Sequence, residues 1–208
     1  MEALAARLAE SGEVAEQGEW LRHVPVTHVA RALEGSTRMG RWGTRGGVPS
    51  LYLGRPQDSV VVEAYRHLVD PVELDTDADR EAFMTGLVPR ALLTCTVNVT
   101  CLLDLRTDMG RNQAGLTVQD LTSDTVDRDA YSRCQHVSQA AHESGRHGII
   151  APAATGMGET LALFVDVLPD EEKPRRSRDD QIWPRLPDDP RIAPRPPLRL
   201  VENPEKRR

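Results

Sequence analysis

The chain has 208 residues, of which 39% are hydrophobic and 28% charged, and its formal net charge is −6. A domain of this length can bury a sufficient core without disulfides or a structural metal. The acidic balance argues against nucleic acid as a partner, because phosphate neutralisation needs a basic face. No apolar run approaches the roughly 18 residues of a membrane-spanning helix, so we expect no membrane partner.

The sequence divides into three parts. Residues 1–17 predict an amphipathic helical extension, with Leu4 and Leu8 on one side. This extension lacks the basic and apolar regions of a secretion signal. Residues 18–169 are the expected ligand-binding domain, and residues 170–208 are a tail.

The domain is expected to begin with an extended piece at 20–26 and a helical turn at 27–33. A glycine-rich loop follows at 40–47, where four glycines in eight residues let the backbone approach a ligand closely. Arg41 and Arg45 in this loop carry permanent charge and can each donate two N–H groups to a phosphate. The loop therefore indicates a site for a phosphorylated ligand.

An aromatic residue and a carboxylate follow the loop. A short apolar strand exposes Tyr52, and the helix predicted at 59–68, with Asp58 and Ser59 as its caps, carries Glu63 among valines. Placing a carboxylate in apolar surroundings costs free energy, so its presence there suggests a functional role. Arginines for phosphates, an aromatic ring for stacking and a half-buried carboxylate together suggest that the protein handles a phosphorylated nucleotide.

The remaining body alternates strands and helices. Residues 91–105 alternate threonine or asparagine with cysteine or valine, which is typical of a strand with one buried face. An acidic loop at 75–80 comes before it. The other expected elements are helices at 117–120 and 130–144 and strands at 148–152 and 161–167.

The composition changes after residue 169. Eight of the 15 prolines fall in residues 170–208, together with 11 Lys or Arg and 9 Asp or Glu. This composition predicts a disordered or loosely attached extension. Ile182 and Trp183 are the residues within it that could dock on the domain.

Each candidate side chain also has a plain structural interpretation. Glu63 could act as a general base or stabilise a developing positive charge, or it could lie on a solvated helix edge. Arg22, taken alone, is typical of a strand-edge arginine, and Arg38 and Arg45 are typical of surface charge. Arg41 is more suggestive, because the neighbouring glycine and tryptophan place it on a tight turn.

The cysteines and histidines give no metal-ligand spacing. The three cysteines include no CxxC pair and are expected to be reduced thiols of a cytoplasmic protein. His136, His142 and His147 lack the i, i+4 spacing of a helical metal pair, so we expect no metal. The chain also lacks a phosphate-binding P-loop, a nucleophile elbow and a dinucleotide-binding fingerprint.

Five landmarks in chain order resemble the RES family, which is named for its Arg, Glu and Ser. The resemblance runs from about residue 20 to residue 168. The glycine-rich loop matches the family's Gly-Arg-Trp-Asn-x-x-Gly pattern, with Gly43 in place of the asparagine. The landmarks are Leu21-Arg22-His23, Gly40-Arg41-Trp42-Gly43-Thr44-Arg45-Gly46, Leu51-Tyr52-Leu53-Gly54, Val61-Val62-Glu63 and Gly148-Ile149-Ile150-Ala151-Pro152.

The resemblance implies a fold, an activity and partners. The fold would be α/β (α+β): an ADP-ribosyltransferase-like split mixed sheet around an NAD cleft, with helices packed on it. RES proteins are bacterial toxins of toxin–antitoxin pairs, and they consume NAD or transfer its ADP-ribose to a protein. The expected partners are NAD and a helix-turn-helix (Xre-class) antitoxin protein, and a homodimer is left open.

The resemblance also assigns roles to residues. Glu63 and Arg22 would be catalytic, with Glu63 stabilising the positive charge that develops on the ribose as nicotinamide leaves. Arg22 and Arg41 would hold the pyrophosphate of NAD, and His23 and Tyr52 would wall in the nicotinamide.

Two positions depart from the family pattern. His23 replaces the usual tyrosine or valine, and Ala153 stands where the family has its serine, although it is still expected in the binding site. Thr155 could supply a hydroxyl two residues later. The sequence therefore leaves three activities open: an NAD-degrading toxin that uses water or phosphate, a protein ADP-ribosyltransferase, and a catalytically weakened NAD-binding protein.

Overall fold

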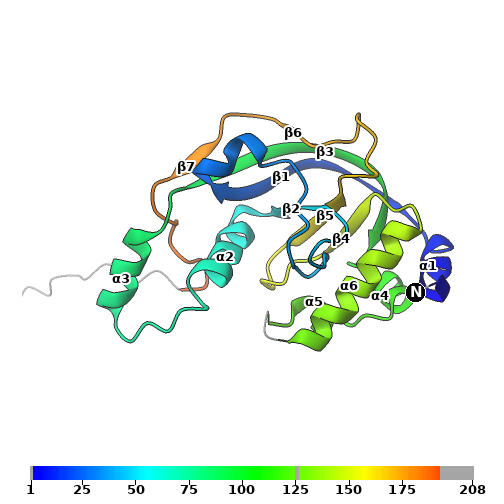
Figure 1. Cartoon of the computed structure of the whole chain (residues 1–208), viewed down its shortest axis with the longest axis horizontal. Coiled ribbons are helices and arrows are strands. Elements are labelled where there is room, and N and C mark those ends of the chain that lie inside the picture. The colour runs from blue at the N-terminus through cyan, green and yellow to red at the C-terminus, as the bar shows by residue number, and fades with distance from the viewer. Residues whose placement is uncertain (1, 125–126, 193–208) are drawn as a thin grey trace, which may run out of the picture.

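A computed structural model describes residues 2–124 and 127–192. It shows a mixed α/β fold, as the sequence predicts, in which a curved sheet is flanked by two groups of helices (Figure 1). The strands are β1 (Val14–Pro25), β2 (Ser50–Arg55), β3 (Arg90–Asp104), β4 (Gly148–Pro152), β5 (Glu159–Phe164), β6 (Arg175–Arg176) and β7 (Gln181–Trp183). The helices are α1 (Glu2–Ala9), α2 (Gln57–Leu68), α3 (Asp77–Gly86), α4 (Asp108–Ala114), α5 (Val118–Thr122) and α6 (Arg128–Glu143), with a 3-10 helix η1 (Val26–Arg31) after β1.

The long strand β3 organises the sheet. It pairs antiparallel with β1 from Val14 opposite Leu102 to Pro25 opposite Arg90, and its last residues pair in parallel with β4. The strand order β1-β2-β5-β4-β3 therefore closes on itself through the contact between β1 and β3.

This closure corrects the expectation of a sheet split into two halves. The 15 residues of β3 are long enough to pair with β1 along one edge and with β4, β6 and β7 along the other. The strands consequently belong to one continuous seven-stranded sheet. The likeness to ADP-ribosyltransferases stays a prediction.

The two faces of the sheet bury separate cores. Alternate residues of β3, among them Leu93, Cys95 and Val97, pack inside the closed sheet with Trp20 of β1. Helices α1, α4, α5 and α6 pack on one outer part of the sheet, around Phe164. Helices α2 and α3 pack on another part, toward the opposite end of the β1–β3 arch (Figure 1). The alternation predicted for β3 is therefore confirmed at residues 95–100, whereas residues 91–95 are all buried.

The N-terminal extension is shorter than expected. Helix α1 ends at Ala9, and β1 already begins at Val14, so residues 14–17 belong to the sheet. The structural reason is the β1–β3 ladder, which reaches back to Val14.

Helix α3 lies where the sequence suggested an acidic loop. Thr76 caps it by accepting a hydrogen bond from the backbone N–H of Asp79, and two aspartates in its first turn suit the positive end of the helix dipole. Helix α2 also begins differently from the prediction. It starts at Gln57, and neither Asp58 nor Ser59 caps it through a side chain.

The prediction of a loosely attached tail is wrong for residues 175–191. Strands β6 and β7 pair with β3, and the Tyr65 hydroxyl donates to the backbone carbonyl of Pro187 at 2.9 Å. Trp183 is 3% exposed in the core that α2 and α3 cover. Apolar burial and backbone pairing thus outweigh the proline-rich composition. Residues 193–208 of the predicted tail lie outside the described residues.

None of the helices that the structure describes is both long and apolar enough to cross a membrane. The three cysteines are free thiols. Across residues 2–124 and 127–192, no cluster of three or more histidine, cysteine, aspartate or glutamate side chains is arranged to hold a metal ion.

We predict that Trp183→Ala destabilises the fold by about 3 kcal/mol, because truncating a buried tryptophan leaves a cavity in the core. Ile182→Ala is the matched control, since Ile182 is 53% exposed on the same strand. Urea unfolding of the two variants measures the difference. Equal unfolding free energies for both variants would show that β7 does not pack as described.

Candidate active site

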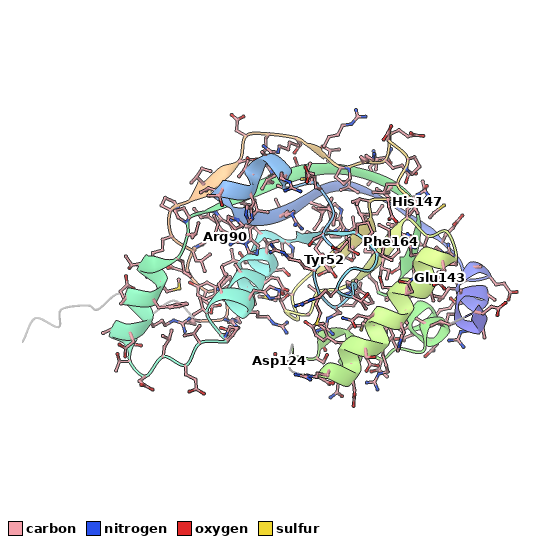
Figure 2. The ribbon with its side chains drawn as sticks, viewed as in Figure 1. Tyr52, Arg90, Asp124, Glu143, His147 and Phe164 are labelled. Atoms are coloured by element: carbon pink, nitrogen blue, oxygen red, sulfur yellow. The ribbon has the colours of Figure 1, made fainter. Side chains whose placement is uncertain are left out.

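One cavity gathers all the site residues predicted from the sequence. Its volume is about 470 Å³, which is within the range of small-molecule sites. It lies where β1, β2 and α2 meet the loops at 36–42 and 152–154. Figure 2 shows Tyr52 in the space between α2 and α6. The predicted residues in its wall are Arg22, His23, Arg41, Tyr52, Glu63 and Ala153.

Glu63 is placed by the two-sided character of α2. Val60, Val61 and Ala64 pack into the core, and this directs Glu63 and His67 toward the cavity. The Glu63 side chain is 40% exposed, and its Oε1 lies 2.7 Å from Nε2 of His67. The carboxylate is therefore held by one partner while it remains open to the cavity.

The environment of Glu63 favours its charged form. Burial raises the pKa of the carboxyl group, but the hydrogen bond to His67 and the positive charges of His67 and Arg66 outweigh burial, so the pKa lies below its ordinary value. The same hydrogen bond raises the pKa of His67. Near neutral pH the cavity thus presents an ionised carboxylate.

Arg22 is a half-buried cation that makes few hydrogen bonds within the protein. Its Nη1 donates to the backbone carbonyl of Tyr52 at 2.7 Å, and its Nε is buried without a partner. Burial lowers the pKa of this guanidinium. A buried donor without an acceptor is uncommon, and because the Nε is enclosed, a ligand in the cavity would have to contact another part of the Arg22 guanidinium.

Arg41 and Tyr52 fix the glycine-rich loop. Arg41 donates to the backbone carbonyls of Asp120 and Ser123. The hydroxyl of Tyr52 accepts from the backbone N–H of Trp42 at 2.9 Å, and a side chain at Gly40 would collide with that hydroxyl. The loop therefore needs glycine next to Arg41, and much of the hydrogen-bonding capacity of Arg41 holds protein rather than ligand.

His23 is a neutral wall of the cavity. Arg90 donates to its Nδ1 at 3.0 Å, and the ring stacks on Trp183 with centroids 6.4 Å apart. Burial and the adjacent positive charge of Arg90 lower the pKa of His23 to about 3. The ring is consequently uncharged near neutral pH and can face a flat ligand group.

Ala153 closes the cavity on the loop side. It is 2% exposed, and its backbone N–H donates to the carbonyl of Gly158 at 3.0 Å, which tightens the turn. Thr155 is absent from the described lining of the cavity. Its hydroxyl lies 2.9 Å from that of Ser59, which does line the cavity.

Several lining residues were missed from the sequence. Arg66 follows Glu63 by three residues, so helical spacing could have indicated it. Arg38, which the sequence suggested was ordinary surface charge, lines the cavity, whereas Arg45 is exposed elsewhere. No local signal marks Arg90, which reaches the cavity through the β1–β3 register.

The cavity carries a surplus of positive charge. Among the described residues that line it, the arginines are Arg22, Arg38, Arg41, Arg66 and Arg90, and the carboxylate is Glu63. Four of these arginines donate to neutral acceptors, namely backbone carbonyls, a serine hydroxyl and the His23 ring. These bonds leave the guanidinium charges unneutralised, and the site therefore favours an anionic ligand.

Comparisons with known proteins find relatives that cover most of this chain. The family model described as the RES domain matches residues 13–186. A probable NAD(+) phosphorylase of Mycobacterium tuberculosis is 33% identical over 185 residues, which cover 88% of this chain and 79% of the relative. The NAD(+) phosphorylase MbcT of Mycobacterium bovis is 29% identical over 166 residues, which cover 78% of this chain and 82% of the relative.

A solved structure shows the same fold. The crystal structure of the M. tuberculosis MbcT–MbcA toxin–antitoxin complex contains a chain that matches with a TM-score of 0.70 and 23% identity, over 88% of this chain and 94% of that chain. The family match spans most of the sequence, and the first relative is identical at 33% of the 185 aligned positions. The chain therefore belongs to the RES domain family.

Proposed function

We propose that this protein degrades NAD by cleaving the bond between nicotinamide and ribose. The observation that carries the proposal is the placement of Glu63, an ionised carboxylate that faces a cavity with a surplus of arginines. The names of two relatives as NAD(+) phosphorylases support it.

The chemistry needs little from the protein beyond charge and position. The bond between the anomeric carbon and the pyridinium nitrogen breaks, its electron pair neutralises the nitrogen, and nicotinamide leaves. The ribose then carries an oxocarbenium-like positive charge, which Glu63 stabilises. An acceptor oxygen then bonds to the anomeric carbon: an ionised phosphate oxygen has no proton to lose, whereas water or a protein hydroxyl releases its proton to solvent.

The arginines fit the other half of the substrate. NAD carries two negative charges on its pyrophosphate, and guanidinium groups bind phosphate oxygens through paired donors. The hydrogen bond described for Arg22 uses only its Nη1, whereas Arg41 spends two of its nitrogens on the loop at Ser123. We therefore assign pyrophosphate binding first to Arg22, with Arg41 in a supporting role. His23 and Tyr52 would enclose the nicotinamide.

Phosphate is the acceptor that we favour. The charge of the cavity would attract an anionic acceptor more strongly than water, and the two named relatives are phosphorylases. The product would then be ADP-ribose carrying a phosphate on its anomeric carbon. Hydrolysis would instead give free ADP-ribose, and transfer would leave ADP-ribose on a protein.

A protein partner forms part of the proposal. The MbcT–MbcA complex is a toxin bound to its antitoxin, and the fold of this chain is similar. We propose that this chain likewise acts as a toxin held by an antitoxin, with a helix-turn-helix (Xre-class) protein as the expected partner. Its cytoplasmic location and a homodimeric state stay predictions.

We predict that Glu63→Gln abolishes nicotinamide release with little change in stability. The side chains are nearly isosteric, but the charge that meets the oxocarbenium ion is lost, which costs roughly a hundredfold or more in rate. Glu73→Gln, at an exposed position, is the matched control. The assay measures nicotinamide release with and without inorganic phosphate and identifies the ADP-ribose product.

Three results would count against this assignment. Unchanged release in Glu63→Gln would remove Glu63 from the chemistry, and no release by the parent protein would contradict the proposed function itself. Release that does not depend on phosphate and gives free ADP-ribose would replace phosphorolysis by hydrolysis.

We further predict that His67→Ala shifts the acidic limb of the pH–rate profile to higher pH. His67 lowers the pKa of Glu63, so its removal leaves burial to raise that pKa. Activity requires ionised Glu63 and is lost as pH falls through this pKa, so the loss begins at a higher pH in the variant. His28→Ala, at an exposed position outside the cavity lining, is the control. An acidic limb that stays where it is in the parent would show that the Glu63–His67 contact does not govern activity.

A further inference from the structure

We propose that Ser59 is a further substrate-contacting residue of this site, with its hydroxyl directed at the nicotinamide ribose and positioned by Thr155. The inference rests on the proposed function and deepens it. It is motivated by the lack of a hydrogen-bonding side chain at Ala153, the loop residue in the cavity wall, which offers only a methyl group.

Helical geometry places Ser59 next to Glu63. The two residues are four positions apart on α2, so they project from the same face one turn apart. Both line the cavity. If Glu63 contacts the bound ribose, Ser59 therefore lies one helical turn from that contact.

Thr155 holds the Ser59 hydroxyl in place. The two hydroxyl oxygens are 2.9 Å apart, and Ser59 is 3% exposed. Thr155 is itself fixed, because its Oγ1 accepts from the backbone N–H of Met157 at 3.2 Å and lies 3.1 Å from the carbonyl of the same residue. The loop thus directs its hydroxyl to α2 rather than into the cavity.

Counting donors and acceptors leaves Ser59 with capacity for a ligand. A serine hydroxyl has one donor and two acceptor positions. Thr155 donates its proton to the carbonyl of Met157, so in the bond between the two hydroxyls Ser59 is the donor. The lone pairs of Ser59 then remain to accept from a ribose hydroxyl.

A ribose presents two neighbouring hydroxyl groups. Glu63 can accept from one of them, and Ser59 can bond to the other, so both would orient the ring as the nicotinamide bond breaks. The alternative role for Ser59 is purely structural: its bond to Thr155 would pin the 153–158 loop to α2 and touch no substrate.

The test compares Ser59→Ala, Thr155→Val and the double variant, with Thr155→Ser as the control that keeps the hydroxyl. We expect Ser59→Ala to lower kcat/KM for nicotinamide release roughly five- to tenfold, the scale of one hydrogen bond. Thr155→Val should lose less, because the Ser59 hydroxyl stays at the cavity. Urea unfolding of each variant measures the structural contribution separately.

Substrate analogues make the test specific to contact. NAD whose nicotinamide ribose lacks its 2-hydroxyl or its 3-hydroxyl is compared with NAD in the parent and in Ser59→Ala. Removing the hydroxyl that Ser59 contacts should slow the parent, relative to NAD, by several-fold more than it slows the variant. For each protein the measure is the rate with NAD divided by the rate with the analogue. Comparing this ratio between the parent and Ser59→Ala cancels any difference in intrinsic reactivity between the sugars.

The outcomes separate this inference from the proposed function. If the parent releases nicotinamide but Ser59→Ala stays within twofold of it, or if both deoxy analogues give the same ratio in parent and variant, the substrate contact is overturned. Equal losses of activity in Ser59→Ala and Thr155→Val, matched by equal losses of unfolding free energy, would also overturn it in favour of the structural role. If the parent releases no nicotinamide, the proposed function fails and this inference fails with it.

Discussion

The pairing of β1 along β3 is the constraint on which the site depends. It sets Arg22 opposite Leu93 and closes the sheet, and the contact of Leu21 with Gly54 brings β1 against β2. Arg22 can then donate to the carbonyl of Tyr52, thirty residues away in the sequence. A slip of one residue in this register would turn each β1 side chain to the opposite face of the sheet, and the cavity would lose Arg22 and His23 from their present positions.

The second feature is electrostatic. Burying guanidinium groups without carboxylate partners is unfavourable, because each loses hydration that neutral acceptors replace only in part. Arg22 shows this cost in its lowered pKa and its unpartnered Nε. The apolar faces of α2 and the sheet hold these groups in place, and an anionic ligand would offset the free-energy cost of burying their charge. The site is thus less stable empty than occupied, which suits a protein that binds a dinucleotide.

The sequence predicted most of what local patterns encode. Alternation located β3, the apolar helix located Glu63, and the glycine-rich loop located Arg41. The misses have physical causes. Arg90 reaches the site, and β7 reaches the sheet, through pairing between strands far apart in the chain, which no local pattern specifies. Composition misled the prediction for residues 175–191, because a few well-placed contacts on β3 outweigh many prolines.

A crystal structure of the Glu63→Gln protein with NAD would test the central claim most directly, because this substitution is designed to keep the substrate intact. The account predicts nucleotide density in the cavity, with the nicotinamide ribose against residue 63 and the pyrophosphate within hydrogen-bonding distance of Arg22. NAD bound elsewhere, or bound in the cavity with its pyrophosphate away from Arg22 and its ribose away from residue 63, would contradict it.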